Sequence, residues 1–266
     1  MKDNFDFYKT VVHQTLPRAN CIWIPKIIGA KKNVVLASEY CGGEYVFKFT
    51  DKNYAIRNSH ISQAFRNAGI HVPEIIAQSC DNQWFEMYPA ISGQTLFECV
   101  GNGISQSALK SIYSKILKLF EKMSYVDFSN IDFCDIQYAH QTAHNDTSKT
   151  NGVLMGQIIS AAVRIMNIGT ASNIGLYHHG ITPKNIMISR HGEISGLLDI
   201  DEVGICNKNY AMGVLTAKAQ LLGMDINALC DEYERVSGQR LNRAQVSTIA
   251  RIQNFGRNIL YRTKSK

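Results

Sequence analysis

Residues 176–201 read LYHHGITPKNIMISRHGEISGLLDID, and they carry the most informative pattern in the chain. The apolar run Ile186–Ile188 follows Asn185, a polar turn comes next, and a second apolar run ends at Asp199 and Asp201. Two short apolar runs around a polar turn predict a β-hairpin. Because a hairpin brings its two ends together, we expect Asn185 and Asp199 to be neighbours. An amide oxygen and a carboxylate suit Mg²⁺ bound to nucleotide phosphates.

The pattern resembles the catalytic core of the aminoglycoside phosphotransferase and choline kinase family. That family reads His-Gly-Asp-Leu-x-x-x-Asn, then a hairpin, then Ile/Leu-Asp-x-Asp. Aligned without gaps, His178 matches the His, Asn185 the metal-binding Asn and Asp199 the principal metal-binding Asp. The resemblance implies a two-lobed protein-kinase-like fold that uses ATP and Mg²⁺, with Asp199 as the direct metal ligand and Asp201 behind it.

The family's catalytic Asp falls on Gly180 in this alignment. In the family that Asp accepts a hydrogen bond from the incoming hydroxyl, which a glycine cannot do. The resemblance implies a structural role for His178, which supports the loop backbone, whereas His179 replaces a glycine and is a candidate base. If the glycine at position 180 is the main cause of impaired catalysis, Gly180→Asp should restore the missing carboxylate and raise the rate of phosphotransfer.

A candidate phosphate-binding lysine lies in the N-terminal half. Lys48 sits in the middle of a predicted strand, and the resemblance implies that it contacts the α- and β-phosphates. The family's lysine-orienting Glu falls on Asn58, which brings no charge, so we expect Lys48 to be held less firmly. The turn at 29–33 has no Gly-x-Gly-x-x-Gly motif; Lys31 is a candidate phosphate contact there, and an ordinary hairpin turn is the alternative.

Hydrophobic periodicity predicts an α+β chain with a small antiparallel β-rich N-lobe and a larger helical C-lobe. We expect an N-terminal nucleotide-binding lobe over 1–88, a hinge over 89–93 and a C-terminal lobe over 94–266. Met87 and Tyr88 resemble the linker positions that contact adenine. The N-lobe should hold a three-stranded meander over 22–50, a helix over 54–67 and strands over 74–78 and 83–88. The C-lobe should hold the hairpin and helices over 107–123, 153–171, 210–222, 226–236 and 242–261.

One further departure from the family follows the hairpin. The family's Tyr-Asp-Leu reads Tyr210-Ala211-Met212 here. Because the Asp of that motif is usually structural, its loss predicts a re-formed loop at this point. Three changes in one catalytic apparatus, at 180, 58 and 211, favour a protein with reduced or absent phosphotransfer.

Composition limits where the protein works. The 266 residues are 45% hydrophobic and 19% charged, which is ordinary for a globular chain, and no apolar stretch is long enough for a membrane span. The first residues show no apolar signal-peptide segment, and seven cysteines are scattered without a Cys-x-x-Cys motif. Buried reduced thiols in a cytoplasmic protein explain these features.

The net charge of +6 is concentrated near the C-terminus. No acidic residue follows Glu234, whereas eight Lys and Arg residues do. A basic region could face an anionic partner, and a solvated basic helix is the alternative. No basic groove interleaved with aromatic residues is visible, so nucleic acid is an unlikely partner. We expect a small-molecule acceptor that is anionic or neutral rather than polycationic.

These observations favour an ATP-dependent phosphotransferase that acts on a hydroxyl of a small molecule, such as an antibiotic, a sugar or a metabolite. Because Gly180 replaces the catalytic Asp, we expect its activity to be impaired. The first alternative is a pseudokinase, which binds Mg-ATP without phosphotransfer. The second is an interaction protein that binds no nucleotide.

Overall fold

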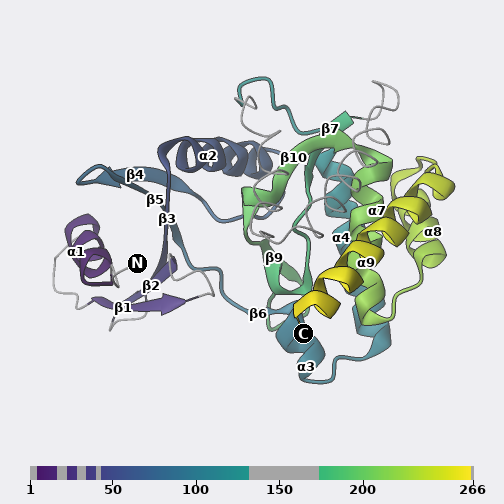
Figure 1. Cartoon of the computed structure of the whole chain (residues 1–266), viewed down its shortest axis with the longest axis horizontal. Helices are drawn as coiled ribbons and strands as arrows, with labels where there is room; N and C mark the ends of the chain where they lie inside the picture. The colour runs from purple at the N-terminus through teal and green to yellow at the C-terminus, as the bar shows by residue number, and fades with distance from the viewer. Residues whose placement is uncertain (1–4, 17–22, 29–33, 40–42, 132–173, 265–266) are drawn as a thin grey trace.

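The computed structural model describes residues 5–16, 23–28, 34–39, 43–131 and 174–264. It shows a sheet-rich N-terminal part beside a mainly helical C-terminal part that also contains two small sheets (Figure 1). This is the two-lobed α+β protein-kinase-like architecture that the sequence predicts. The turn at 29–33 with Lys31 and the predicted helix over 153–171 lie outside the described residues.

The N-terminal part is built on one antiparallel sheet of five strands in the order β1-β2-β3-β5-β4. The strands are β1 (Trp23–Ile28), β2 (Val34–Glu39), β3 (Glu44–Thr50), β4 (Ile76–Cys80) and β5 (Gln83–Pro89). The predicted meander and β5 agree with the structure, whereas β4 begins at Ile76 rather than at 74. The hydroxyl of Ser62 donates to the carbonyl of Pro73 and accepts from the amide of Ile75, so the segment before β4 is bound to a helix and not to the sheet.

Two helices flank this sheet. Helix α2 (Lys52–Asn67) begins where the Asp51 carboxylate caps the amide of Tyr54 at 2.9 Å. Helix α1 (Phe5–Thr15) was not predicted. Its Val11 and Val12 are fully buried in a cluster with Phe47, Phe49 and Phe85 of the sheet. The apolar face of this short helix is therefore buried against one face of the sheet.

The C-terminal part begins with β6 (Gln94–Thr95), α3 (Leu96–Gly101) and α4 (Gln106–Met123) and resumes with β7 (Ile174–His178). The hairpin β8 (Ile186–Ile188) and β9 (Ile194–Leu197) forms as predicted. Strand β10 (Val203–Asn207), which was not predicted, pairs with β7. Helices α7 (Lys208–Ala219), α8 (Ile226–Ser237) and α9 (Arg243–Lys264) complete this part, with single 3₁₀ turns at Pro183–Asn185, Ile200–Glu202 and Gln220–Leu222.

One expectation for the C-terminal part is wrong. Tyr210, Ala211 and Met212 do not form an altered loop, because they lie inside α7 and are buried. Their apolar side chains join the large core that also holds Phe120 and Tyr177, so the Ala at 211 is accommodated by packing. Within the described segments, no helix is long and apolar enough to cross a membrane.

Candidate active site

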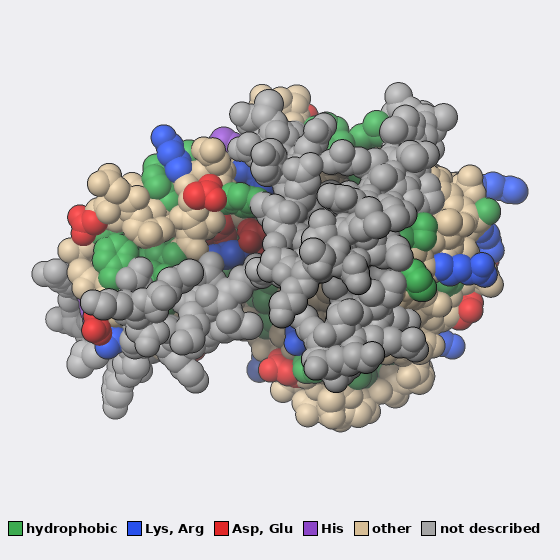
Figure 2. Space-filling model, in the orientation of Figure 1, with side chains coloured by type: hydrophobic (Ala, Val, Ile, Leu, Met, Phe, Trp, Pro, Cys, Tyr) green, Lys and Arg blue, Asp and Glu red, His purple; other side chains and the backbone are tan. Residues whose placement is uncertain are grey.

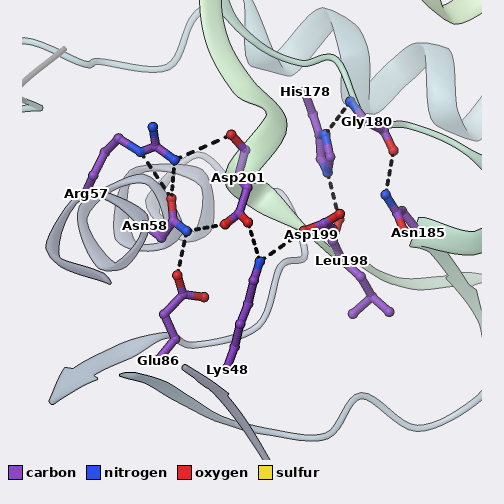
Figure 3. Close-up of polar contacts among 10 residues, drawn as sticks. All are labelled: Lys48, Arg57, Asn58, Glu86, His178, Gly180, Asn185, Leu198, Asp199 and Asp201. Carbon is purple, nitrogen blue, oxygen red and sulfur yellow. Dashed lines mark hydrogen bonds and ion pairs between the residues drawn. The ribbon is translucent and has the colours of Figure 1, made fainter. Parts of the chain in front are cut away.

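A charged cluster lies where the N-terminal sheet meets the C-terminal part, and Figure 2 shows basic and acidic side chains in the hollow between them. The ammonium of Lys48, on β3, lies 3.0 Å from Oδ1 of Asp199 and 2.6 Å from Oδ2 of Asp201 (Figure 3). Both aspartates follow β9 closely. These two ion pairs connect the two parts of the molecule, because Lys48 is separated from Asp199 by 151 positions and from Asp201 by 153 positions in the sequence.

Lys48 is held by more charge than the sequence suggested. Strand pairing places Glu86 of β5 directly opposite Lys48, and the Glu86 side chain is almost fully buried. The amide nitrogen of Asn58, on α2, donates to Glu86 at 2.6 Å and to Oδ1 of Asp201 at 2.5 Å. The expectation of a loosely held lysine is wrong in this respect, because strand β5 supplies a carboxylate that helix α2 lacks.

A second cation supports the amide of this cluster. The guanidinium of Arg57 donates from Nη2 to Oδ1 of Asn58 at 3.0 Å and to the carbonyl of Asp201 at 3.4 Å (Figure 3). Arg57 is buried, and its guanidinium also lies over the Tyr54 ring at 4.3 Å. Because the Asn58 oxygen accepts from Arg57, its nitrogen is directed toward the two carboxylates.

The protonation states follow from these contacts. Burial by itself lowers the pKa of Lys48, but the charges of Asp201, Glu86 and Asp199 outweigh it and raise that pKa above its usual value. Burial raises the pKa of Glu86 to about 7, against the opposing effect of Lys48. For Asp201, burial is outweighed by Lys48 and Asn58, which lower its pKa. The cluster therefore keeps a charged lysine at neutral pH.

The loop that carries Gly180 is fixed by side-chain hydrogen bonds. Nδ1 of His178 accepts from the amide of Gly180 at 3.0 Å, and Nε2 lies 2.8 Å from the carbonyl of Leu198. The amide nitrogen of Asn185 donates to the carbonyl of Gly180 at 2.8 Å, and the Leu198 amide donates to the Asn185 carbonyl at 2.8 Å. The expected neighbourhood of Asn185 and the strand end before Asp199 is therefore present.

The two aspartates differ in how much of each carboxylate is used. Both oxygens of Asp201 accept hydrogen bonds, one from Lys48 and one from Asn58. Asp199 accepts only from Lys48 among the described contacts, and its side chain is 45% exposed. Its backbone also lies in the left-handed region, with a φ of 58°, which is uncommon and costly for a residue with a side chain.

These donors fit a metal ion that is shared with nucleotide phosphates. Among the described residues, no group of three or more His, Cys, Asp or Glu side chains is arranged to hold a metal alone. Mg²⁺ in nucleotide sites needs only one or two protein oxygens, because phosphates and water complete its shell. The half-exposed carboxylate of Asp199 and the amide oxygen of Asn185 are the hard oxygen donors that such a site requires.

Neither histidine faces this cluster as a base. Burial lowers the pKa of His178 to about 4, so the ring is neutral and its two nitrogens serve the backbone. His179 is buried with its ring 5.6 Å from that of Tyr210, on the side of α7. These positions favour a structural role for both rings.

The surroundings of Gly180 leave little free space for a side chain at this position, and the gain of activity expected from Gly180→Asp stays a prediction. A Cβ atom on Gly180 would lie 2.6 Å from Oε2 of Glu202 and 2.8 Å from Cε1 of His178. Such distances are too short for real Cβ contacts, so Gly180→Asp would force neighbours to move. Another carboxylate already occupies this space.

The predicted adenine-contacting residues lie at the end of β5. Tyr88 pairs with Val46 of β3 and so shares a sheet face with Lys48, whereas Met87 pairs with Phe47 and packs with the apolar cluster on the opposite face. Burial raises the pKa of the Tyr88 phenol, and the charges of Lys48 and Glu86 also act on it. Backbone contact with adenine at these two residues stays a prediction.

Sequence reasoning missed Glu86, Arg57 and Glu202. A signal for Glu86 existed, because it alternates with Phe85 and Met87 as Lys48 alternates with Phe47 and Phe49. Two charged residues at equivalent places in neighbouring apolar strands could have been paired with each other. Arg57 and Glu202 gave no comparable signal, since each is simply a charged residue beside a predicted site residue.

Comparison with known structures supports the same architecture. An aminoglycoside-3'-phosphotransferase of type VIII superposes with a TM-score of 0.68 at 14% identity, over 96% of this chain and 100% of that one. The aminoglycoside phosphotransferase APH(3'')-Id of Streptomyces rimosus, solved with ADP and streptomycin, gives 0.68 at 13% identity, over 96% and 99%. Choline kinase LicA of Streptococcus pneumoniae gives 0.66 at 12% identity, over 93% and 87%.

These likenesses establish that the chain has the kinase-like fold of aminoglycoside phosphotransferases and choline kinase. No protein-family model matches the sequence, and no curated protein matches it either. At such low identities the shared feature is the fold, and the activity has to be argued from the residues of the site.

Proposed function

We propose that this protein is a phosphotransferase that uses ATP and Mg²⁺ to phosphorylate a hydroxyl group of a small molecule. The observation that carries the proposal is the meeting of Lys48 from β3 with Asp199 after β9 at 3.0 Å. A largely buried lysine and a half-exposed carboxylate, which come from the two parts of the molecule, are the two charges that a triphosphate with its metal needs.

Each residue of the cluster has a place in this reaction. Lys48 would neutralise the phosphates, and Asp199 with Asn185 would hold Mg²⁺, which offsets the charge of the triphosphate when bound. Asp201 fixes the ammonium of Lys48, and Asn58 fixes Asp201. The side chain of Asn185 also donates a hydrogen bond to the carbonyl of Gly180. The proposed metal ligand is therefore connected to the loop that carries His179 and Gly180, which we call the acceptor loop. Such positioning supplies most of the acceleration in phosphoryl transfer.

The acceptor belongs to the class of small hydroxyl-bearing molecules. Proteins of this fold have been solved with streptomycin and with kanamycin, and another is a choline kinase. The expected preference for an anionic or neutral acceptor rested on the basic C-terminal region. Arg235 and Arg243 of that region are engaged with acidic side chains of α8, at 2.5–2.7 Å, so these two arginines do not form an open cationic patch. A panel of sugars, phosphorylated metabolites and polycations tests this preference directly.

The glycine at 180 favours a second candidate function. A pseudokinase would bind Mg-ATP through Lys48 and Asp199 and transfer nothing, because residue 180 offers no carboxylate to an acceptor. This alternative shares the nucleotide site with the enzyme and differs only in the chemical step. Nucleotide binding and turnover must therefore be measured separately.

The nucleotide site is tested by thermal unfolding with Mg-ATP and with Mg-GTP. We expect either nucleotide to raise the Tm of the wild type in the presence of Mg²⁺, and Asp199→Asn to abolish that shift, because the carboxylate ligand is lost. Glu193→Gln is the matched control, since Glu193 is an exposed carboxylate on the same hairpin that pairs with Lys115 at 2.7 Å. An equal shift in wild type and Asp199→Asn would refute the site.

A further inference from the structure

The side chain of Glu202 occupies the space that a side chain at 180 would take. Its Oε2 lies 2.6 Å from the position of a Cβ atom on Gly180, and its own Cβ lies 3.0 Å from the same point. The first distance resembles the two-bond separation between the Cβ of an aspartate and its carboxylate oxygens. A carboxylate oxygen is thus present near where an Asp at 180 would begin, although it comes from another element.

Glu202 is fixed to the acceptor loop at its backbone. The amide of His179 donates to the carbonyl of Glu202 at 2.9 Å, immediately before Gly180. Glu202 closes the 3₁₀ turn Ile200–Glu202 that begins directly after Asp199. One short segment therefore carries both the predicted metal ligand and the carboxylate beside Gly180, so their separation is set by local geometry.

The carboxylate of Glu202 is oriented by an ion pair and is accessible to solvent. Its Oε2 lies 3.7 Å from the ammonium of Lys218, on α7, and Lys218 also donates to the carbonyl of His179. The Glu202 side chain is 53% exposed, whereas that of Lys218 is 14% exposed. A buried lysine thus holds an exposed carboxylate next to the loop, which leaves the carboxylate open to a ligand in solution.

We propose that Glu202 is the catalytic carboxylate of this protein and replaces the aspartate missing at position 180. The inference rests on the proposed phosphotransferase function. The alternative is a structural role, in which Glu202 is a surface residue that serves only as the ion-pair partner of Lys218. Two features favour catalysis over that alternative. Oε2 of Glu202 lies in the space that a side chain at position 180 would fill, and this space is available because residue 180 is a glycine.

In the reaction, the acceptor hydroxyl donates a hydrogen bond to the Glu202 carboxylate. The hydroxyl oxygen attacks the γ-phosphorus of ATP, and a new O–P bond forms. The bond between the γ-phosphorus and the bridging oxygen breaks, and its electron pair leaves with ADP. The hydroxyl proton passes to Glu202 and then to solvent. The products are a phosphate monoester and ADP, or inorganic phosphate and ADP when water is the acceptor.

The test begins with Glu202→Gln, which keeps the size of the side chain and removes its charge. Formation of ADP from Mg-ATP, which accompanies transfer to any acceptor, is measured with water as acceptor and with a panel of kanamycin, streptomycin, choline and neutral sugars. We expect kcat to fall by about 10²–10⁴-fold, the usual contribution of a positioned acid or base. The Kd for Mg-ATP, measured by calorimetry, should stay within about twofold, because Glu202 does not hold the nucleotide. Glu193→Gln should match the wild type in both measurements.

A relocation experiment separates catalysis from structural support. Gly180→Asp/Glu202→Ala moves the carboxylate back to residue 180 and removes the side chain that blocks it. We expect this double variant to be at least about tenfold faster than Glu202→Ala, which recovers part of the about 10²–10⁴-fold that a positioned acid or base supplies. Gly180→Asp alone should be slower than the wild type, since two carboxylates would crowd one space. A glutamate that only pairs with Lys218 would give no recovery in the double variant.

The outcomes distinguish the inference from the function on which it rests. A wild type that does not bind Mg-ATP refutes both the proposed function and the inference. A wild type that binds Mg-ATP and turns nothing over refutes the role of Glu202 and supports the pseudokinase. Turnover that is unchanged in Glu202→Gln refutes the role of Glu202 alone and leaves the phosphotransferase intact.

Discussion

At the scale of single residues, His178 shows how the acceptor loop is held. Its ring is buried between the end of β7 and the end of β9. Nδ1 accepts from the Gly180 amide, so Nε2 carries the proton and donates to the Leu198 carbonyl. The neutral ring therefore satisfies two backbone groups in the interior, and a charged ring would lose the bond to Gly180.

This arrangement predicts acid sensitivity. Burial lowers the pKa of His178 from 6.5 to about 4, so the unfolded chain takes up the proton first as pH falls. The contribution of the neutral His178 ring to the free energy of unfolding is fully present above about pH 6.5. It is lost as the pH falls toward 4, and the loss is at most roughly 3 kcal/mol. Urea unfolding at pH 7 and pH 5 should show a smaller loss in His178→Gln than in the wild type. His191→Gln, on an exposed hairpin turn, is the control, and equal losses in all three proteins would contradict the prediction.

At the scale of elements, helices α7 and α9 cross at a glycine. A Cβ atom on Gly213 would lie 2.6 Å from the Cβ of Ile249 and 3.0 Å from the carbonyl of Val246. Glycine is unfavourable inside a helix, so its presence in α7 has a packing reason. One turn further along α7, Lys218 donates a hydrogen bond to the carbonyl of His179 in the acceptor loop.

Enlarging this contact should destabilise the C-terminal part. We expect Gly213→Ala to lower the free energy of unfolding by about 1–3 kcal/mol, because Ile249 and the α9 backbone must move apart. Gly101→Ala is the matched control, since Gly101 lies in a helix with no atom within 4 Å of an added Cβ. Chemical denaturation measures both. A Gly213→Ala protein as stable as the control would show that the crossing is loosely packed.

At the scale of the whole molecule, the charged cluster is the polar connection between the two parts. Lys48 and Glu86 come from the sheet, Asn58 from α2, and Asp199 and Asp201 from the segment after β9. The ammonium of Lys48 and the guanidinium of Arg57 therefore compensate three carboxylates. Because Lys48 and Glu86 are well shielded from solvent, the balance of charge matters for stability as well as for the proposed binding of a nucleotide.

Removing the lysine should expose this dependence. Lys48→Met leaves the buried Glu86 and the partly buried Asp201 with Arg57 as the remaining cation of the cluster. Removing one partner of a buried charge pair typically costs up to about 3–5 kcal/mol. Glu86 already has a pKa raised to about 7, chiefly by burial, and Lys48 opposes that rise. A carboxyl group with a raised pKa in the folded state destabilises the fold as pH increases. The loss in Lys48→Met should therefore be larger at pH 8 than at pH 6, as measured by urea unfolding.

A second variant checks the cause of that loss. Lys48→Met/Glu86→Gln replaces the buried acid with an amide, so it should recover part of the stability and show a weaker dependence on pH. Mg-ATP should bind weakly to both variants, because the phosphates lose their ammonium partner. A Lys48→Met protein that matches the wild type at pH 8 would reduce Lys48 to a surface residue.

Features that depend on neighbouring residues could be predicted from the amino-acid sequence. The hairpin after Asn185 follows from two short apolar runs around a polar turn, and it brings Asn185 to the strand end before Asp199. The strand around Lys48 and the amphipathic helix α4 follow from periods of two and of three to four residues. These patterns, with the motif between 176 and 201, were sufficient for the two-lobed kinase-like fold.

Which charged side chains contact one another depends on the packing of distant segments. Glu86 faces Lys48 because of the register between β3 and β5, and a shift of one residue would have turned it to the opposite face. Glu202 reaches the space above Gly180 because the pairing of β7 with β10 brings residues 178 and 203 together. Such contacts join segments that are distant in sequence, so local periodicity carries no record of them. The fold is encoded in short patterns, whereas the partners of a buried charge depend on how those patterns are finally packed.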